Sequence, residues 1–264
     1  MKDQAVCLQY EAKNCNSQNG PGNFIDKVEL LNLRTQLPTI SSTLWSKNEL
    51  FKGTLILIIR RPGCAICRDE AALLASKRSL IESKFKIKMV CVIHQLEGHE
   101  ELVRDYWKGD CYLDSGRGFY KALGNGTYNM ARAITTLSNP IVWKRWRNAK
   151  SKGVKDSYSG EGRILGGLFI ISSKGVHYSY VERLSSPPPM EEILTTCENI
   201  YNTFEEEKLK EEVHTFESES NMEKNKREFR KDSATETEIL LDYYFDSHFC
   251  LKDDGGYLDK KPKV

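Results

Sequence analysis

The sequence has no long hydrophobic run and no apolar segment near its start. Its apolar stretches reach only about eight residues, whereas a helix that spans a bilayer needs roughly 18. Residues 1–20 are too polar to contain the apolar segment of a secretory signal peptide. We therefore expect a soluble, cytoplasmic protein with no transmembrane segment.

Charge of one sign is not in excess either. The chain has 39 lysines and arginines against 37 aspartates and glutamates, a formal net charge of +2. This balance excludes a protein that binds nucleic acid over most of its surface, because such a protein carries a large positive excess. The basic aromatic stretch WKRWRNAK (143–150) could bind a membrane surface, a nucleic acid or a protein partner. An amphipathic helix that packs its tryptophans on a sheet is the simpler interpretation, so we expect no nucleic-acid partner.

Clusters of cysteine are also lacking. Eight cysteines in 264 residues, without a signal peptide, are expected to be thiols and not a disulfide framework. Only Cys64 and Cys67 have the spacing of a metal or redox pair, and no second pair of ligands has zinc-site spacing, so we expect no metal. The other six are isolated: Cys7, Cys15, Cys91, Cys111, Cys197 and Cys250.

The hydrophobic pattern that is present alternates strands with helices, as in an α/β protein. Apolar runs at 54–59 and 89–93 have strand length without alternation, which is typical of strands covered on both faces. A helical stripe over 64–85 joins them into a strand–helix–strand unit. Runs at 164–171 and 176–181 predict a hairpin. Further strands are expected at 25–33 and 110–114, and helices at 42–51, 99–107, 119–123, 139–153 and 187–204.

Composition divides the chain into three parts. Residues 1–23 are polar and are expected to form a flexible N-terminal arm. Residues 24–204 have a globular composition and form the expected domain. Of the 28 residues in 205–232, 10 are acidic and 7 are basic. The charged C-terminal extension, 205–264, is therefore predicted to be disordered or loosely helical and not part of the core.

The strongest chemical signal is the C-x-x-C formed by Cys64 and Cys67, directly after a buried strand and at the start of a helix. A helix N-terminus favours a thiolate and lowers a cysteine pKa from about 8.5 to roughly 3.5–7.5. We expect Cys64 to be the open, attacking thiolate and Cys67 the more buried, resolving thiol. This placement favours a thioredoxin-like fold, a mixed sheet flanked by helices. Half of a zinc site and two inert packed thiols are the other interpretations.

Three arginines lie close to this pair in the sequence: Arg60, Arg61 and Arg68. Each adds positive potential near the sulfurs. Arg60 and Arg61 alternate sides at the strand end, so one of them could stabilise the thiolate or a departing oxygen anion. Arg61 is slightly favoured for this role, and a surface charge pair is the alternative.

Two segments carry a resemblance to a known family. RRPGCAICRDEAALLA (60–75) and GEGRILGGLFIISSKG (160–175) together resemble the peroxiredoxin-like 2 proteins of the AhpC/TSA type. Shorter matches lie at KGDCYLD (108–114) and FYKALG (119–124), and the resemblance covers about residues 25–204. It implies a thioredoxin-like fold, antioxidant activity and a redox-active C-x-x-C.

The chain departs from the best-known relatives of that family at two points. Ordinary peroxiredoxins cradle the peroxide with a Pro-x-x-x-Thr/Ser-x-x-Cys motif, whereas here Pro62 is two residues before Cys64 and no Thr or Ser lies between them. Ordinary thioredoxins have a cis-proline that faces the disulfide. The residues expected to face the site in this chain are Leu165, Gly166 and Gly167.

These observations lead to one function and two alternatives. We expect an antioxidant thiol oxidoreductase in which Cys64 attacks a peroxide and Cys67 closes a disulfide. It needs no bound cofactor, and an external thioredoxin or glutathione system restores the dithiol. One alternative is reduction of a prostaglandin endoperoxide, as in the sister group of prostamide/prostaglandin F synthases. The other is a non-enzymatic redox-sensing module that binds a partner through 205–264.

Overall fold

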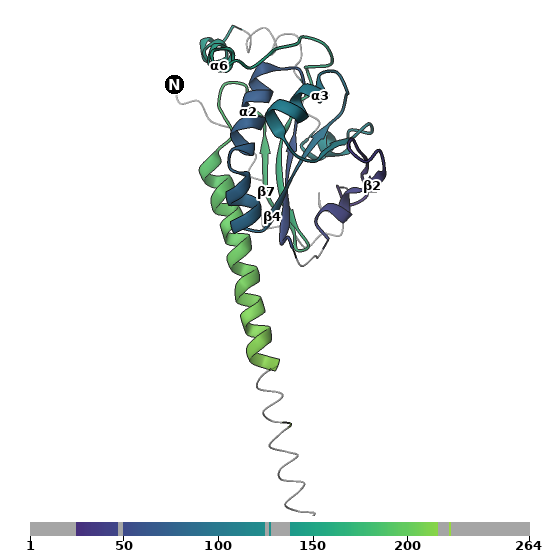
Figure 1. Cartoon of the computed structure of the whole chain (residues 1–264), viewed down its shortest axis with the longest axis vertical. Coiled ribbons are helices and arrows are strands. Elements are labelled where there is room, and N and C mark those ends of the chain that lie inside the picture. The colour runs from purple at the N-terminus through teal and green to yellow at the C-terminus, as the bar shows by residue number, and fades with distance from the viewer. Residues whose placement is uncertain (1–24, 47–49, 125–126, 128–137, 216–221, 223–264) are drawn as a thin grey trace, which may run out of the picture. The chain divides into compact units, whose positions relative to one another are not determined.

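The computed structural model describes residues 25–46, 50–124, 127, 138–215 and 222. Among these residues the fold centres on a seven-stranded mixed sheet (Figure 1). Its strands, in sheet order, are β2 (Pro38–Ile40), β1 (Glu29–Asn32), β5 (Cys111–Leu113), β4 (Ile87–Ile93), β3 (Gly53–Ile58), β6 (Gly167–Ser172) and β7 (Gly175–Val181). The pairs β3–β4 and β4–β5 are parallel, and the other neighbouring strands are antiparallel.

The helices connect and cover these strands. Helix α2 (Ala65–Ala75) follows β3 and precedes β4, and a helix over residues 190–215 follows the β6–β7 hairpin. A strand–helix–strand unit followed by a hairpin and a helix on one central sheet is the thioredoxin-like arrangement, so that prediction is confirmed. The remaining helical segments are η2 (Ser41–Leu44), η3 (Ser79–Lys84), α3 (His99–Glu101), η4 (Leu102–Trp107), α4 (Gly118–Ala122) and α6 (Pro140–Ser151).

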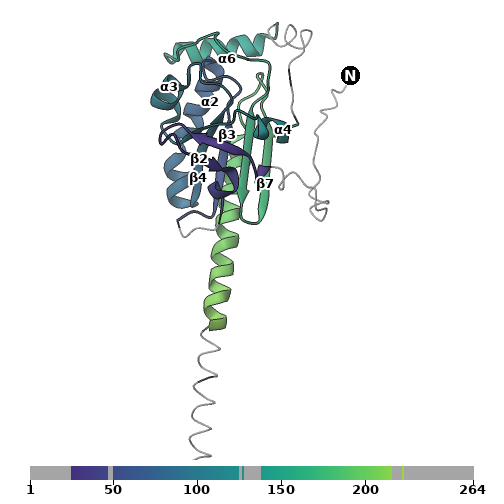
Figure 2. The same ribbon diagram turned by 90° about the vertical axis from the view of Figure 1, so that its right-hand side faces the viewer.

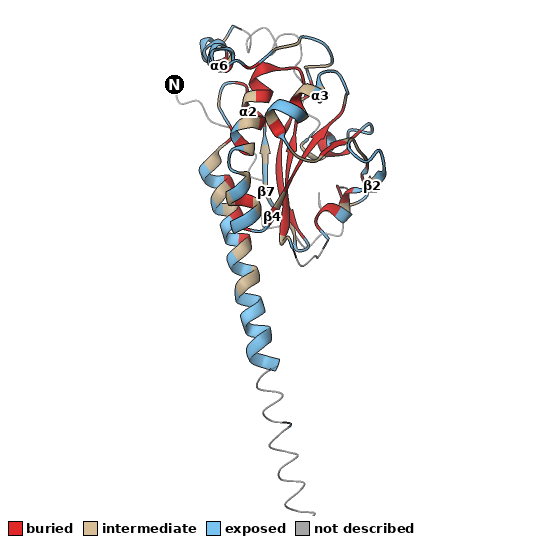
Figure 3. Ribbon diagram, viewed as in Figure 1, coloured by how far each residue is buried: buried red, intermediate tan, exposed pale blue. Residues whose placement is uncertain are grey.

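The sheet is buried on both faces, which explains the apolar runs without alternation. Leu55 and Leu57 of β3 pack in a core with α2, η4 and the helix that begins at 190, whereas Ile56 and Ile58 pack in a second core with Phe119 of α4. Figure 3 shows the central strands buried along their length. This burial holds the carboxyl end of β3, which leads into the C-x-x-C turn, in a rigid position.

Several predicted elements differ from the structure. The single helix expected at 64–85 is two segments, α2 and the π-helical η3, separated by a turn at 76–77. The helix expected at 42–51 is one 3₁₀ turn, η2, with residues 47–49 outside the described part. A loop was expected around Pro38, but Pro38 lies in the edge strand β2, where its missing N–H costs no ladder bond.

Helix α6 is where the sequence predicted it, and it packs against α2 (Figure 2). Asn139 caps its start through a hydrogen bond from the N–H of Ile141 at 2.9 Å, and Pro140 occupies the first turn. The tryptophans of α6, which were expected to pack on the sheet, differ in their burial, and α6 itself contacts α2. Trp146 packs against the core, whereas Trp143 is 47% exposed.

The chain divides into two units, Met1–Glu205 and Glu206–Val264. In the second unit, residues 206–215 are helical and exposed. The expected N-terminal arm at 1–23 and nearly all of the extension beyond 215 lie outside the described residues. No helix in the described part of the chain is both long enough and apolar enough to span a bilayer.

Candidate active site

The C-x-x-C lies where β3 gives way to α2. Strand β3 ends at Ile58, and Cys64 is the N-cap of α2, with an extended backbone (φ −73°, ψ 127°) whose carbonyl accepts the N–H of Arg68 at 3.0 Å. The Cys64 side chain does not cap the helix. Instead Asp156 accepts the N–H of Ala65 at 3.1 Å through Oδ1. The sulfur of Cys64 therefore lies at the helix N-terminus without capping it, and it can contact other groups.

Both sulfurs lie against the guanidinium of Arg60. Its Nη2 is 2.9 Å from Sγ of Cys64 and 3.6 Å from Sγ of Cys67. Cys64 is more exposed than Cys67, as expected from their order on the helix, but the fractions are only 6% and 2%. The expectation of an open Cys64 is therefore wrong, because Arg60 and the chain that packs over the turn shield it.

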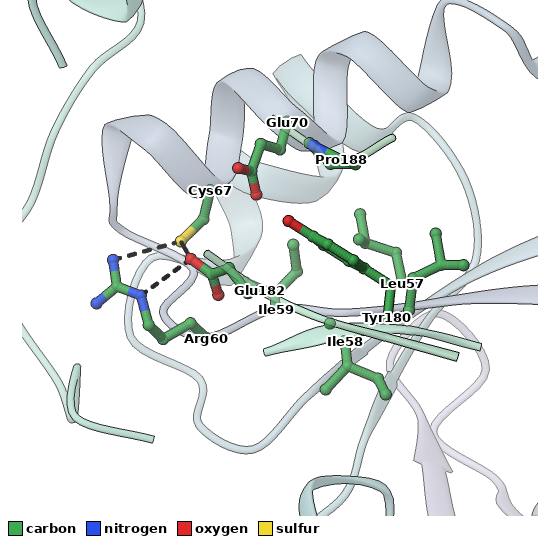
Figure 4. Close-up of a pocket in the computed structure, with 11 residues that line it drawn as sticks. Leu57, Ile58, Ile59, Arg60, Cys67, Glu70, Tyr180, Glu182 and Pro188 are labelled. Atoms are coloured by element: carbon green, nitrogen blue, oxygen red, sulfur yellow. Dashed lines mark hydrogen bonds and ion pairs between the residues drawn. The ribbon is translucent and has the colours of Figure 1, made fainter. Parts of the chain in front are cut away.

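Arg60 is held in this position by two further contacts. Its Nε lies 3.2 Å from Oε1 of Glu182, and its Nη1 donates to the carbonyl of Gly162 at 2.8 Å. Arg60 and Glu182 are only 7% and 6% exposed. The same Oε1 of Glu182 is 3.9 Å from Sγ of Cys67 (Figure 4). A buried cation, two sulfurs and a carboxylate therefore form one cluster.

This cluster separates the acidities of the two cysteines. A hydrogen bond from Cys67 and the charge of Arg60 outweigh burial and hold the pKa of Cys64 well below its usual value. The same hydrogen bond, burial and the charges of Cys64 and Glu182 raise the pKa of Cys67 well above its usual value. Cys64 therefore loses its proton at a lower pH than Cys67 does.

Gly166 lets the hairpin approach the end of β3 closely, and Gly167 lets the two strands of the hairpin approach each other. A Cβ at Gly166 would overlap the carbonyl oxygen of Ile58, and one at Gly167 would overlap a backbone oxygen of β7. The N–H of Gly166 also donates to Oε2 of Glu182 at 3.2 Å. The glycines therefore allow close backbone approach and position Glu182, and Leu165, beside them, is half-buried.

The other two arginines, Arg61 and Arg68, make hydrogen bonds to backbone carbonyls. The structure places Arg60, and not the favoured Arg61, against the sulfurs. Arg61 donates to the carbonyl of Tyr158 at 3.3 Å and lies over its ring at 5.6 Å. Arg68 is fully buried and supports the turn, with contacts to the carbonyls of Pro62, Lys155 and Gly98 and an ion pair with Glu101.

The loop over residues 155–163 covers the C-x-x-C turn. The N–H of Ser157 donates to the carbonyl of Gly63 at 2.8 Å, and a Cβ at Gly63 would lie 2.9 Å from the carbonyl oxygen of Ser157. Asp156 of this loop also accepts the indole N–H of Trp146 at 2.7 Å. The loop is therefore tied both to the turn and to α6, and it limits access to Cys64.

Behind Cys67 lies a cavity of about 10 Å³ (Figure 4). Its polar lining includes Glu70 of α2, Tyr180 of β7 and Glu182, and the rest is mainly apolar. Glu70 is buried and accepts from Nη2 of Arg145 at 2.6 Å. Burial and the neighbouring Glu182 outweigh Arg145 and raise the pKa of Glu70 to about 8.

Sequence reasoning missed Glu70, Asp156 and Glu182. Glu70 is three residues after Cys67 and so lies on the inward helical stripe, a signal that could have been used. Glu182 directly follows the expected strand at 176–181, but only the tertiary structure brings it to the C-x-x-C. Nothing in the local sequence marks Asp156 as the acceptor for α2.

Cys91 and Cys111 have no role in this chemistry, and Cys7, Cys15 and Cys250 lie outside the described residues. Cys91 and Cys111 are register neighbours on β4 and β5, and both are buried in the sheet. Burial raises the pKa of Cys91 well above its usual value, so it remains a thiol. Within the described ranges, no group of three or more His, Cys, Asp or Glu side chains is arranged to hold a metal ion.

Comparisons with known sequences find similarity to the same kind of protein, the peroxiredoxin-like antioxidant proteins. Residues 73–184 match the family model described as AhpC/TSA antioxidant enzyme, which begins just after the C-x-x-C. Peroxiredoxin-like 2A of Xenopus tropicalis is 34% identical over 153 residues, 57% of this chain and 63% of that protein. The human protein of the same name is 29% identical over 151 residues, 57% of this chain and 62% of that protein. The match thus spans less than two thirds of these relatives.

Two solved peroxiredoxin-type structures resemble this chain at low sequence identity. Peroxiredoxin 6 of Arenicola marina has a TM-score of 0.45 at 13% identity and covers 67% of this chain and 70% of that one. Bacterioferritin comigratory protein of Xanthomonas campestris has a TM-score of 0.46 at 11% identity and covers 69% of this chain and 97% of that one. The chain is therefore similar both to AhpC/TSA antioxidant enzymes and to the peroxiredoxin-like 2A proteins.

Proposed function

We propose that this protein is a thiol oxidoreductase that reduces a small peroxide through Cys64 and Cys67. The observation that carries the proposal is the guanidinium of Arg60, which lies 2.9 Å from Sγ of Cys64 and 3.6 Å from Sγ of Cys67. A buried cation at hydrogen-bond distance stabilises a thiolate, which is the reactive form of cysteine. The raised pKa of Cys67 keeps that thiol protonated until it is needed.

The proposed reaction has two balanced steps. The Cys64 thiolate attacks one peroxide oxygen and the O–O bond breaks. Sulfur becomes a sulfenic acid, and the other oxygen leaves with a proton from solvent as water or an alcohol. Cys67 then loses its proton and attacks the Cys64 sulfur, and the S–O bond breaks so that hydroxide leaves and is protonated to water. An external dithiol from a thioredoxin or glutathione system reduces the resulting disulfide.

Arg60 takes the place of the missing Thr or Ser of ordinary peroxiredoxins in this proposal. In the first step negative charge moves from sulfur to the departing oxygen. Nη2 of Arg60 already faces Cys64, and its Nη1 and Nε are fixed by Gly162 and Glu182. A preorganised donor of this kind stabilises the developing oxyanion without reorganisation.

The size of the site favours a small peroxide over a prostaglandin endoperoxide. Cys64 is 6% exposed, and the cavity beside Cys67 has a volume of about 10 Å³. Such a cavity accommodates about one water molecule. A lipid endoperoxide would need the loop 155–163 to move, whereas hydrogen peroxide needs little more room than two water molecules.

The test is peroxide consumption by the full-length protein with dithiothreitol as reductant. We expect Cys64→Ser to abolish turnover of hydrogen peroxide and Cys67→Ser to leave a sulfenic acid on Cys64 that dimedone traps. Cys91→Ala, which removes a buried thiol remote from the reaction, is the matched control and should retain turnover. Full turnover by Cys64→Ser, or no turnover by the unaltered protein, would exclude this function.

A further inference from the structure

Two buried carboxyl groups lie beside Cys67, and neither takes part in proton transfer in the steps above. Glu182 and Glu70 are 6% and 7% exposed, and both line the cavity of about 10 Å³ that borders Cys67. Figure 4 shows them on the same side of the Cys67 sulfur. Burying one carboxylate is costly, and burying two within one cavity is costlier still, so such a pair retains a proton.

The contacts distinguish the two members. Glu182 faces the cation, because its Oε1 is 3.2 Å from Nε of Arg60, and the same oxygen is 3.9 Å from Sγ of Cys67. Glu70 is on α2, one turn beyond Cys67, and its carboxyl meets Arg145 at 2.6 Å. Glu182 is therefore the member next to the thiol, and Glu70 is the member on α2 whose pKa is raised by burial and by Glu182.

We propose that Glu70 and Glu182 form a carboxyl pair that holds one proton at neutral pH, and that its ionised member, Glu182, accepts the proton of Cys67 as the disulfide closes. This role rests on the proposed redox function and assigns the proton acceptor of its second step. In that step the S–H bond of Cys67 breaks, its electron pair forms the S–S bond, and its proton goes to the Glu182 carboxylate. The pair then releases a proton to solvent, with room in the cavity for about one water.

The charges around Glu70 make the pair sensitive to the state of the cysteines. The titratable and charged groups that face it are Cys64 and Cys67 of α2, Arg60 after β3, Tyr180 and Glu182 of the hairpin, and Arg145 of α6. The negative charge of the Cys64 thiolate helps to raise the pKa of Glu70 to about 8. That charge vanishes in the disulfide. The dithiol form therefore binds the proton of Glu70 more tightly than the disulfide form does.

The first experiment uses this difference and does not involve peroxide. The equilibrium between the full-length protein disulfide and dithiothreitol is measured from about pH 6 to about pH 10. We expect the slope of that equilibrium against pH to change near pH 8 in the unaltered protein. Glu70→Gln should remove this change of slope. Asp69→Asn alters the neighbouring, more exposed carboxylate that pairs with Lys152, and it should leave the change of slope in place.

The second experiment separates the two reaction steps after one equivalent of hydrogen peroxide. Dimedone labelling follows the sulfenic acid on Cys64 as it forms and as it disappears. We expect Glu182→Gln to slow the disappearance at least tenfold, within the range of a general base. Glu70→Gln should change the pH dependence of that step while sulfenic acid formation stays within about twofold, because Glu70 makes no contact with the attacking sulfur.

The outcomes distinguish the two proposals. If the unaltered protein forms no sulfenic acid on Cys64, the proposed peroxide reduction fails, whereas the dithiothreitol equilibrium still tests the carboxyl pair. A change of slope that persists in Glu70→Gln overturns the shared-proton role. Disulfide closure at an unchanged rate in Glu182→Gln overturns its role as the proton acceptor. Circular dichroism verifies that each variant folds, and Glu70→Gln alone suffices for the equilibrium test if Glu182→Gln does not fold.

Discussion

At the scale of single residues, the site depends on one buried cation that contacts both sulfurs. Arg60 is anchored by Glu182 and Gly162, so its guanidinium cannot follow the substrate or move into solvent. Arg61, its neighbour in the sequence, lies on Tyr158 instead. Two adjacent residues of the same type thus have different environments, because the chain turns away from the sheet between them.

Replacement of Arg60 by methionine tests this dependence. Arg60→Met removes the donor at 2.9 Å from Cys64, so the pKa of Cys64 should rise and its alkylation by iodoacetamide near neutral pH should slow by at least tenfold. The buried Glu182 would lose its partner, at a cost of about 3–5 kcal/mol in the free energy of unfolding. Arg61→Met is the control and should change both quantities much less. Equal effects of the two variants would show that the contact with the sulfurs is unimportant.

Gly166 is the second residue on which the site depends. A methyl group there would overlap the carbonyl of Ile58 and lie 2.9 Å from Oε2 of Glu182. We expect Gly166→Ala to lower the free energy of unfolding by about 1–3 kcal/mol, the usual cost of overpacking, and to raise the pKa of Cys64 by displacing the Glu182–Arg60 pair. Gly116→Ala is the matched control, because a Cβ there meets only Oδ1 of Asp114, at 3.9 Å. Urea unfolding and thiol titration measure both effects, and comparable stability of the two variants would contradict the argument.

At the scale of elements, the helix and the loop over it are joined through one carboxylate. Asp156 accepts the first N–H of α2 from Ala65 and the indole N–H of Trp146 on α6. The helix that carries both cysteines therefore has its N-terminal N–H satisfied by a distant loop and not by its own N-cap side chain. Because Asp156 satisfies this N–H, the N-cap position of α2 can be occupied by a residue with a reactive sulfur.

Asp156→Ala should leave the backbone N–H of buried Ala65 and the indole N–H of half-buried Trp146 without an acceptor. We expect a loss of about 1–3 kcal/mol in the free energy of unfolding and faster hydrogen exchange at the amide of Ala65. Asp69→Ala, which breaks a surface ion pair between α2 and Lys152, is the control and should cost at most about 1 kcal/mol. If exchange at Ala65 is the same in the Asp156 variant and the unaltered protein, the loop does not cap α2.

At the scale of the whole molecule, the buried acids make stability depend on pH. The pKa of Glu70 is raised from 4.5 to about 8 by burial and by Glu182. The folded protein thus binds this proton more tightly than the unfolded chain does. The resulting stabilisation is fully present below about pH 4.5 and is lost as pH rises through about 8.

A comparison with Glu70→Gln isolates this contribution. The amide is neutral at every pH, so the variant should not lose this stability as pH increases. We expect its free energy of unfolding, relative to that of the unaltered protein, to increase from about pH 6 to about pH 9. Urea unfolding in excess reductant measures the difference. A difference that stays constant over this range would mean that Glu70 is already ionised in the folded protein.

Patterns within single segments were enough to predict most of the fold. The apolar runs that became β3 and β4 predicted a central sheet, because a strand covered on both faces needs apolar side chains on both. The helix expected at 139–153 also starts where the sequence placed it, because Asn139 and Pro140 act within one turn. The break after α2 was not predictable, because tertiary packing against the sheet decides where a helical stripe ends.

The sequence by itself determined that Cys64 and Cys67 share one helix turn at the end of a buried strand, because strand, turn and helix N-terminus are consecutive in the chain. Only the tertiary structure decided which charges surround them. Glu182 is 115 residues from Cys67 and Asp156 is 91 residues from Ala65, yet both reach the turn. A pKa depends on distance in space and on burial, and neither quantity can be read from separation along the chain.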